Sequence, residues 1–212
     1  MMKLSGISKM LVLSIAFSMS LLLVRFFYSK TMAYSFYGWN TFLAIIPYVS
    51  ATWLLKLKRL KSPAIFLLAT WLVFFPNAPY LITDILHYEE RPPVPFWFDI
   101  LLVISATWNG LILGITSLIN VETFLLRYVK PIWVRVMVFF SLLLCSYGIF
   151  LGRFLRFNSW NIITDPAYLA YTSAHHVLLP QHYPELWVFT ILFAVLLSII
   201  FFTLKKLPRS DE

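Results

Sequence analysis

Apolar residues are concentrated in six long runs, and short segments rich in charged and turn-forming residues separate them. Each run approaches the length of about 20 residues that a helix needs to cross the hydrocarbon core of a bilayer. The pattern therefore predicts an all-α, polytopic membrane protein with six transmembrane helices. The runs are Met10–Tyr28, Tyr37–Leu55, Ala64–Ile82, Phe96–Leu118, Ile132–Leu151 and Leu186–Leu204.

The third run leads into the segment from Phe75 to His87, which contains two prolines, an amide, a carboxylate and an imidazole. Proline lacks a backbone donor and clashes with the carbonyl four residues earlier, which here belongs to Leu72 or Phe75. Lipid offers such a carbonyl no hydrogen bond, so broken helices persist only where they face protein or a wet cavity. The sequence thus predicts a third helix broken by prolines near its outer end, with its freed carbonyls facing the bundle interior.

The composition agrees with a membrane environment. Hydrophobic residues make up 60% of the 212 residues and charged residues 12%, whereas a soluble domain carries roughly 45–50% apolar and about 25% charged residues. We expect the whole chain, residues 1–212, to form a single transmembrane domain. Cys145 is the one cysteine, which excludes an internal disulfide and disfavours a zinc–thiolate site.

The net charge of +8 does not indicate nucleic-acid binding, because the lysines and arginines lie between apolar runs and form no stripe on a soluble face. Positive residues near spans are retained in the cytoplasm. An arrangement with both termini cytoplasmic places 12 of the 17 basic residues inside, which predicts a multi-pass protein of the cell membrane with the lipid bilayer as its partner. These residues are Lys3, Lys9, Lys56, Lys58, Arg59, Lys61, Arg127, Lys130, Arg135, Lys205, Lys206 and Arg209.

The same topology gathers the groups capable of acid–base or ligand chemistry on the outer side. It places there all four histidines and six of the nine acidic residues, so we expect a functional site to open outward. These residues are His87, His175, His176, His182, Asp84, Glu89, Glu90, Asp99, Asp165 and Glu185.

Asp84 and His87 are the first candidates for catalysis. They are three residues apart and would be neighbours on a helix, either as a general base and its orienting group or as two metal ligands. Asn77 would share the face of Asp84 on an unbroken helix and is a candidate for substrate binding. Alternatively, Asp84 caps a helix end and His87 lies among the headgroups. No zinc motif, phosphate-binding glycine loop or serine elbow occurs, so we assign no metal and leave the cofactor unknown.

Asp99 is a third catalytic candidate. It lies near the outer end of the fourth run, on a helix face otherwise made of small residues, and should therefore point into the bundle. A carboxylate at membrane depth needs a partner. Three basic residues lie at this depth, Arg25, Arg153 and Arg156. We expect the partner to be Arg153 or Arg156. A purely structural ion pair is the alternative.

Arg153 and Arg156 are candidates for binding an anion. They are three residues apart at the outer end of the fifth run, which would place both on one side of a helix. Two guanidinium groups suit a phosphate or a carboxylate through bidentate hydrogen bonds, and Asn158 and Asn161 could add further donors. Alternatively, both arginines extend to lipid headgroups.

Small residues predict close helix packing at two places. Glycines four residues apart allow helix backbones to approach each other, and we expect packing to be the role of the pairs Gly110/Gly114 and Gly148/Gly152.

The longest connection, residues 152–185, is predicted to lie outside. In it, Asp165 followed by Pro166 is typical of an N-cap and the first position of a short helix at the membrane interface.

Three motifs together resemble a known family: Pro76-Asn77-Ala78-Pro79-Tyr80 with Thr83-Asp84, then Trp97-Phe98-Asp99, then Gly152-Arg153-Phe154 through Asn158-Ser159-Trp160. The chain resembles the bacterial membrane proteins grouped as domain of unknown function thirteen sixty-one. The resemblance extends from the second run to the last. It implies a multispan membrane protein and supplies no catalytic residue, because the family has no assigned activity.

Three classes of function remain open on the sequence. The first is an enzyme or binding protein whose outward-facing polar pocket binds or modifies an anionic or lipid-linked envelope substrate. The second is a small transporter, for which polar groups would have to continue through the inner half of the bundle. The third is a non-catalytic membrane partner subunit, which needs only a surface.

Overall fold

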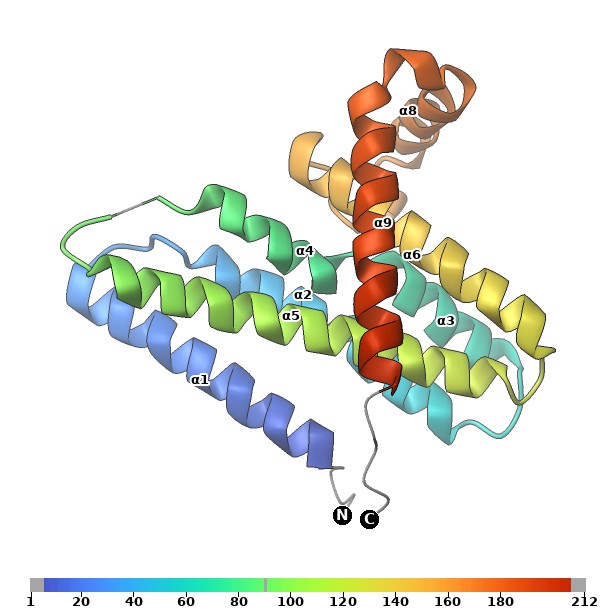
Figure 1. Ribbon diagram of the computed structural model, residues 1–212, viewed down its shortest axis with the longest axis horizontal. Helices are drawn as coiled ribbons and strands as arrows, with labels where there is room; N and C mark the ends of the chain where they lie inside the picture. Colours follow the sequence, from blue (N-terminus) through green and yellow to red (C-terminus); the bar gives the residue numbers. More distant parts are fainter. Residues whose placement is uncertain (1–5, 90, 207–212) are drawn as a thin grey trace. The chain divides into compact units, whose positions relative to one another are not determined.

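The computed structural model describes residues 6–89 and 91–206, and within these residues every regular element is a helix (Figure 1). The elements are α1 (Gly6–Ser29), α2 (Phe36–Lys56), α3 (Ser62–Phe74), α4 (Asn77–Thr83), the 3₁₀ helix η1 (Asp84–His87), α5 (Phe96–Leu125), α6 (Pro131–Phe154), α7 (Asn161–Thr164), α8 (Pro166–Leu178), the 3₁₀ helix η2 (Pro180–His182) and α9 (Pro184–Lys206). The predicted all-α class is confirmed.

Five segments in the described part of the chain are long and apolar enough to cross a membrane. They coincide with the first, third, fourth, fifth and sixth predicted runs, and together they indicate a multi-pass membrane protein. Helix α2, from the second run, is not among them, although it is 21 residues long. Its sequence includes Asn40, Thr41 and Pro47, which lower its apolar character. The spans are Gly6–Ser29, Ser62–Leu86, Phe96–Leu125, Pro131–Phe154 and Pro184–Lys206.

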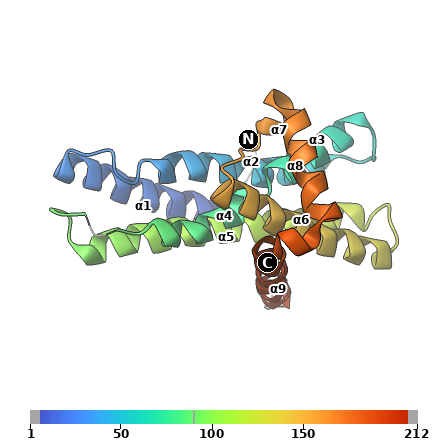
Figure 2. The same cartoon turned by 90° about the horizontal axis from the view of Figure 1, so that it is seen from above.

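The chain divides into two compact units, Met1–Ser117 and Leu118–Glu212. In the first, called unit 1 below, α2 packs against α3 and α4. Figures 1 and 2 both show α1 and α2 running lengthwise beside α5. Tyr37, Ala44 and Leu81 are fully buried in the core of this unit.

The two prolines interrupt the regular hydrogen bonding of the third span only briefly. Helix α3 ends at Phe74 and α4 begins at Asn77, while Phe75 (φ −54°, ψ −41°) and Pro76 (φ −59°, ψ −28°) keep right-handed helical dihedrals. The carbonyl of Phe75 accepts from the Ala78 amide at 3.2 Å, so one of the two carbonyls expected to be freed has a local partner.

Helix α4 packs closely on the glycines of α5. A methyl group added at Gly110 would overlap the carbonyl oxygen of Ala78 and lie 2.8 Å from Cβ of Leu81. One added at Gly114 would lie 3.3 Å from Cβ of Ala78 and from the ring of Pro79. The packing role predicted for this glycine pair is therefore confirmed.

The second unit, called unit 2 below, is built on the pair α6 and α9, which pack along each other. At one end of α9, Lys205 Nζ donates to Oε2 of Glu122 at 2.6 Å. At the other end lies α8, whose N-cap residue Asp165 accepts from the Tyr168 amide at 3.3 Å. Pro166 occupies the first turn, so the short helix predicted from Asp165 and Pro166 is confirmed.

Candidate functional site

Asn77 supports the backbone where α3 passes into α4. Its side-chain amide donates to the carbonyl of Phe74 at 3.0 Å. The Ala78 amide donates to Phe75, and that of Tyr80 donates to Pro76 at 3.0 Å. An asparagine at this position thus satisfies a carbonyl near the point where proline has removed a donor. Its side chain is half-buried.

Asp84 lies at the end of this segment and is buried, with a relative exposure of 1%. Its Oδ2 accepts a hydrogen bond from Nδ2 of Asn40 at 3.0 Å, and its backbone carbonyl accepts from the hydroxyl of Tyr37 at 3.5 Å. A buried carboxylate is tolerated when donors surround it. Helix α2 therefore supplies the polar groups that hold Asp84 in place.

His87 is the last residue of η1, which begins at Asp84. Residues three apart in a 3₁₀ helix eclipse one another, so the backbone is compatible with a pair formed by these two residues. The side chain of His87 lies outside the described part of the structure. Its partnership with Asp84 therefore stays a prediction.

Asp99 is bound by Arg25. The Nε of Arg25 donates to Oδ1 at 2.7 Å and its Nη2 donates to Oδ2 at 3.0 Å, while both side chains are 1% exposed. The pair is bidentate, the geometry for which arginine is best suited. Nη1 of Arg25 donates to the carbonyl of Ala33 at 3.3 Å. The partner of Asp99 is thus on α1 and not the expected Arg153 or Arg156. The geometry favours the structural ion pair among the alternatives.

Two tyrosines connect the environments of the two aspartates. The ring of Tyr34 lies 4.5 Å from the guanidinium carbon of Arg25, and its hydroxyl donates to the carbonyl of Glu89 at 2.7 Å. The rings of Tyr34 and Tyr37 are 5.9 Å apart. Tyr34 is 2% exposed and has a left-handed backbone with φ 67°, which is uncommon for a bulky residue and requires support from its surroundings.

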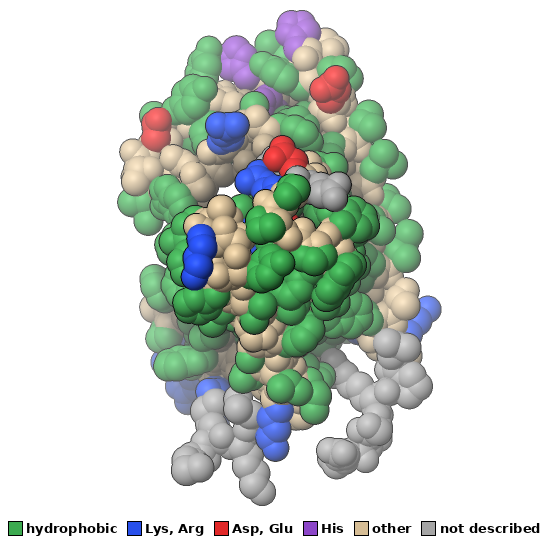
Figure 3. All heavy atoms as spheres, turned by 90° about the vertical axis from the view of Figure 1, so that its left-hand side faces the viewer, with side chains coloured by type: hydrophobic (Ala, Val, Ile, Leu, Met, Phe, Trp, Pro, Cys, Tyr) green, Lys and Arg blue, Asp and Glu red, His purple; other side chains and the backbone are tan. Residues whose placement is uncertain are grey.

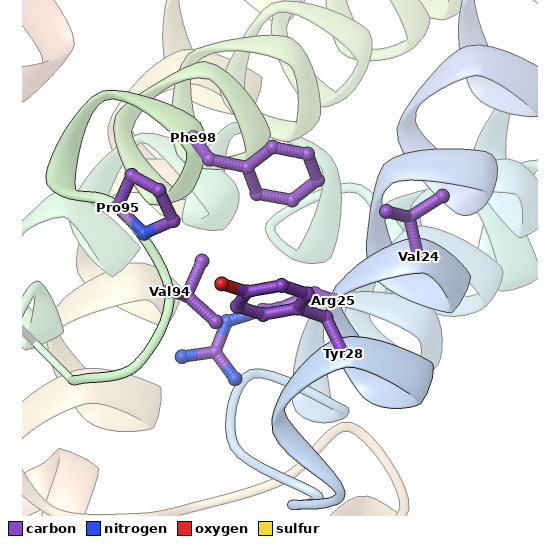
Figure 4. A pocket seen from close by; sticks show the side chains of 6 residues that line it. All are labelled: Val24, Arg25, Tyr28, Val94, Pro95 and Phe98. Atoms are coloured by element: carbon purple, nitrogen blue, oxygen red, sulfur yellow. The ribbon is translucent and has the colours of Figure 1, made fainter.

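A cavity of about 180 Å³ opens beside the ion pair (Figure 4). One side is formed by α1 and the other by the start of α5 and the residues before it. Apart from Arg25 and the hydroxyl of Tyr28, its lining is apolar. The lining residues are Val24, Arg25, Tyr28, Val94, Pro95 and Phe98.

The polar groups in the middle of unit 1 bind one another. Asn109 Nδ2 donates to Ser18 Oγ at 2.7 Å and to the carbonyl of Ser14 at 3.2 Å, and Ser18 donates to Ser105 Oγ at 3.0 Å. Thr107 donates to the carbonyl of Leu81 at 3.1 Å. These bonds tie α5 to α1 and α4.

The candidates in unit 2 occupy the end of α6 and the chain after it. Arg153 is in the last turn of α6 and is 9% exposed. Arg156 follows the helix in a left-handed conformation with φ 58° and is exposed. The two arginines are therefore not one turn apart on a continuous helix. Asn161 accepts from the Asn158 amide at 2.6 Å and so stabilises the turn before α7. The side chain of Asn158 itself is exposed.

His176 fastens α8 to its neighbours in unit 2. Its Nδ1 is 2.9 Å from the hydroxyl of Tyr147, and its carbonyl accepts from Nε1 of Trp187 at 3.1 Å. Burial lowers the pKa of His176, and the charge of the adjacent His175 lowers it further. The imidazole is therefore neutral at pH 7 and acts as a packing and hydrogen-bonding group.

The sequence did not single out Asn40, Tyr34 and Tyr37 as site residues. Tyr37 and Asn40 are three residues apart at the start of α2 and so place polar groups on one side of an otherwise apolar helix, whereas Tyr34 precedes the helix in a left-handed conformation that no sequence pattern indicated. Among the described side chains of residues 6–89 and 91–206, which do not include that of His87, there is no group of three or more from His, Cys, Asp and Glu that could hold a metal ion.

The model of one protein family, described as "Protein of unknown function (DUF1361)", matches residues 39–200. The match includes the Pro76–Asp84 segment and Arg153, and it confirms the family suggested by the three sequence motifs. No curated protein and no solved structure matches the chain. Because the matched region covers more than half of the 212 residues, the chain belongs to the DUF1361 family of proteins of unknown function.

Proposed function

We propose that the protein crosses the cell membrane six times and that an outward-facing site in it binds or modifies an anionic or lipid-linked envelope substrate. The observation that carries this proposal is Asp84, a carboxylate 1% exposed that accepts a hydrogen bond from Asn40. It lies near the end of the candidate span Ser62–Leu86, which also contains Pro76 and Pro79. Ionisable residues at membrane depth are candidates for function, because burying them is unfavourable and they are retained mainly where function requires them.

Helix α2 is the sixth span in this proposal. Its 21 residues correspond to about 32 Å at 1.5 Å per residue, enough to cross the hydrocarbon core. Its polar residues Asn40 and Thr41 and its Tyr37 are directed at other helices or are buried, so they do not oppose insertion. We further propose that Pro76 and Pro79 mark a break near the outer end of the third span.

The residues have separate roles in this proposal. Asp84 serves as the base, with His87 as its orienting partner and Asn77 as a donor to the substrate. Asp99 positions α1 against α5 through Arg25, with both of its oxygens already engaged. In unit 2, by itself, Arg153 and Arg156, with Asn158 and Asn161, form an anion-binding group of their own on the outer side.

An acid-to-amide change tests the role of Asp84. Asp84→Asn preserves shape and removes the base, so we expect it to abolish any change in envelope lipids that the wild-type chain produces. Mass spectrometry of lipid extracts from cells with the wild-type chain, the variant and no chain provides the measurement. Arg153→Lys, which keeps the charge and loses bidentate geometry, should impair the same change while expression stays normal.

Asp165→Asn is the matched control. Asp165 caps α8 through the Tyr168 amide, and asparagine caps helices about as well as aspartate, so lipid composition should match the wild type. Asp84→Asn cells with wild-type lipid composition, at equal expression, would overturn the proposed role of Asp84. If cells with Arg153→Lys and cells with Arg156→Lys both have wild-type lipid composition, the two arginines contact lipid headgroups only.

The topology gives a second prediction. Six spans place the termini and Lys58 on the cytoplasmic side and Glu89 and Pro180 outside, and all three side chains are exposed. In a Cys145→Ser background, single cysteines at Glu89 and Pro180 should react with an impermeant thiol reagent on intact cells, and one at Lys58 should not. The side on which an N-terminal tag is detected distinguishes six spans from five. With six spans the tag and Lys58 lie on the same side of the membrane, and without α2 as a span they would lie on opposite sides.

A transporter is the alternative function, and the hydrogen bonds of unit 1 argue against it. Transport needs polar groups that are available along a path through the inner half of the bundle. Asn109 and Ser105 instead bind Ser18 on α1, and Ser117 accepts from Nε1 of Trp71 at 3.1 Å. These groups join helices to one another, as polar residues in membrane bundles commonly do.

A further inference from the structure

The cavity beside the Arg25–Asp99 pair has the chemistry of a hydrocarbon site. Its lining includes Val24, Val94 and Phe98, and its volume is about 180 Å³. An apolar cavity of about 150 Å³ in another protein stays dry and binds benzene-sized guests. This cavity therefore has room for a short stretch of hydrocarbon, a few carbons in length.

The cavity does not present an available charge to its contents. Arg25 is its one charged lining residue, and this guanidinium donates to both oxygens of Asp99 and to the carbonyl of Ala33. A phosphate would have to displace Asp99 and leave that carboxylate buried without its partner, which is strongly unfavourable. The lining thus selects a neutral, apolar group.

The cavity opens toward lipid. Val24 and Tyr28 on its α1 side are 54% and 62% exposed, and in a membrane-spanning helix the exposed apolar surface meets acyl chains. Figure 3 looks onto the end of unit 1, where α1 ends and α5 begins, and shows mostly hydrophobic side chains with few charged ones between them. Arg25 is four residues, or about 6 Å, from the end of α1. The cavity therefore lies at the depth of the first carbons of a lipid chain.

We propose that this cavity is a lipid site that holds a hydrocarbon segment of an outer-leaflet lipid. The segment packs between the α1 side, at Val24 and Tyr28, and the α5 side, at Val94 and Phe98. Exposed Lys30 lies two residues beyond Tyr28 and is placed to contact the headgroup of an anionic lipid. The site would present a lipid-linked substrate to the outer face. In this respect it rests on the proposed function, but lipid contact itself does not require Asp84.

Photochemical labelling of the full-length protein tests the proposal. The chain is reconstituted in phosphatidylcholine vesicles with a trace of phosphatidylglycerol carrying a diazirine near the glycerol end of one acyl chain. We expect label in the peptides containing Val24–Tyr28 and Val94–Phe98, and we expect unlabelled phosphatidylglycerol to compete it away. A phosphatidylcholine tracer with the same diazirine is used in parallel. Weaker labelling by this tracer shows a preference for the anionic lipid, and equal labelling shows that the site takes any phospholipid.

Two tryptophan variants provide the comparison. Val24→Trp fills the cavity and should lower this labelling by at least about tenfold, corresponding to about 1.4 kcal/mol of lost binding. Leu23→Trp, at the same depth on α1 but outside the lining, should leave it within about twofold of the wild type. Phe98→Trp fills the cavity from the α5 side and replaces Val24→Trp if that variant does not fold.

Two results would overturn the lipid site: labelling that rises in proportion to the tracer without competition, or equal labelling in Val24→Trp and Leu23→Trp. Either result leaves the proposed function untouched, because the readout is lipid contact and not a change in envelope lipids. Conversely, wild-type lipid composition in Asp84→Asn cells would overturn the role of Asp84 and leave the labelling result standing.

Discussion

Replacing Asp99 with leucine is expected to destabilise unit 1 by about 3–5 kcal/mol, because it leaves the guanidinium of Arg25 buried without its counter-ion. Both partners are 1% exposed and joined by two hydrogen bonds, so water cannot replace the lost carboxylate. Arg25→Met should be destabilising by a similar amount, since it leaves the carboxylate unpaired. Urea-induced unfolding of the purified protein in detergent micelles measures both free energies.

The double variant Arg25→Met/Asp99→Leu distinguishes a lost charge pair from a packing defect. Replacing both members of a buried pair with apolar residues of similar volume is often neutral or stabilising, so the double variant should recover most of the stability. The exposed pair Arg91–Glu89, with side chains 46% and 70% exposed, is the matched control. Removing it should change stability by about 0–1 kcal/mol. Additive losses in the double variant would show that packing, and not charge, accounts for the single-variant effects.

The Arg25–Asp99 pair also shows which features of this protein a sequence predicts and which it does not. Composition and length predicted a helical membrane protein because they depend on local residues alone. The partner of Asp99 is separated from it by 74 residues, and any of three arginines at comparable predicted depth could have served. The choice is made by packing of α1 on α5, which includes the Asn109–Ser18 contact. Local pattern does not encode that packing.

Helix ends illustrate a second limit. The fourth apolar run was predicted to end at Leu118, yet α5 continues to Leu125. The added turns include Glu122, which is 6% exposed and bound to Lys205. An apolar run in the sequence ends at the first polar and charged residues, although the backbone hydrogen bonds of the helix continue beyond them. Helix α6 also continues past the predicted end at Leu151, to Phe154. The left-handed Arg156 follows it, so the two arginines do not share a helix face.

The Pro76–Asp84 segment was predicted as the centre of a site on the strength of its residue types. The residues that hold it in place were found only in the structure. Asn40 on α2 donates a hydrogen bond to Asp84. Gly110 on α5 has no side chain and so leaves room for the backbone of Ala78. Residues on two helices distant in sequence thus determine the position of Asp84, and their relevance becomes visible only when the helices are packed.

The close approach of α4 to α5 leads to the second large effect, which is expected for Gly110→Ala. The added Cβ would overlap the carbonyl oxygen of Ala78 and lie 2.6 Å from Cδ1 of Leu81. A backbone carbonyl cannot rotate away as a flexible side chain can, so α4 as a whole must move. Overpacking of this kind typically costs about 1–3 kcal/mol, and Gly110→Leu should exceed this range. The same urea titration in micelles provides the measurement.

Two other glycines supply a graded comparison for Gly110→Ala. At Gly114 the nearest atoms would be 3.3 Å away, on Ala78 and the Pro79 ring, so Gly114→Ala should have a smaller effect. At Gly38 the nearest atom is Cδ2 of Leu22 at 3.6 Å, an ordinary contact, and alanine is a better helix former than glycine. Gly38→Ala should therefore be neutral or slightly stabilising. Equal stability in all three variants would mean that α4 does not depend on α5 for its position. Asp84, six residues beyond Ala78, would then have to be held by α2 alone.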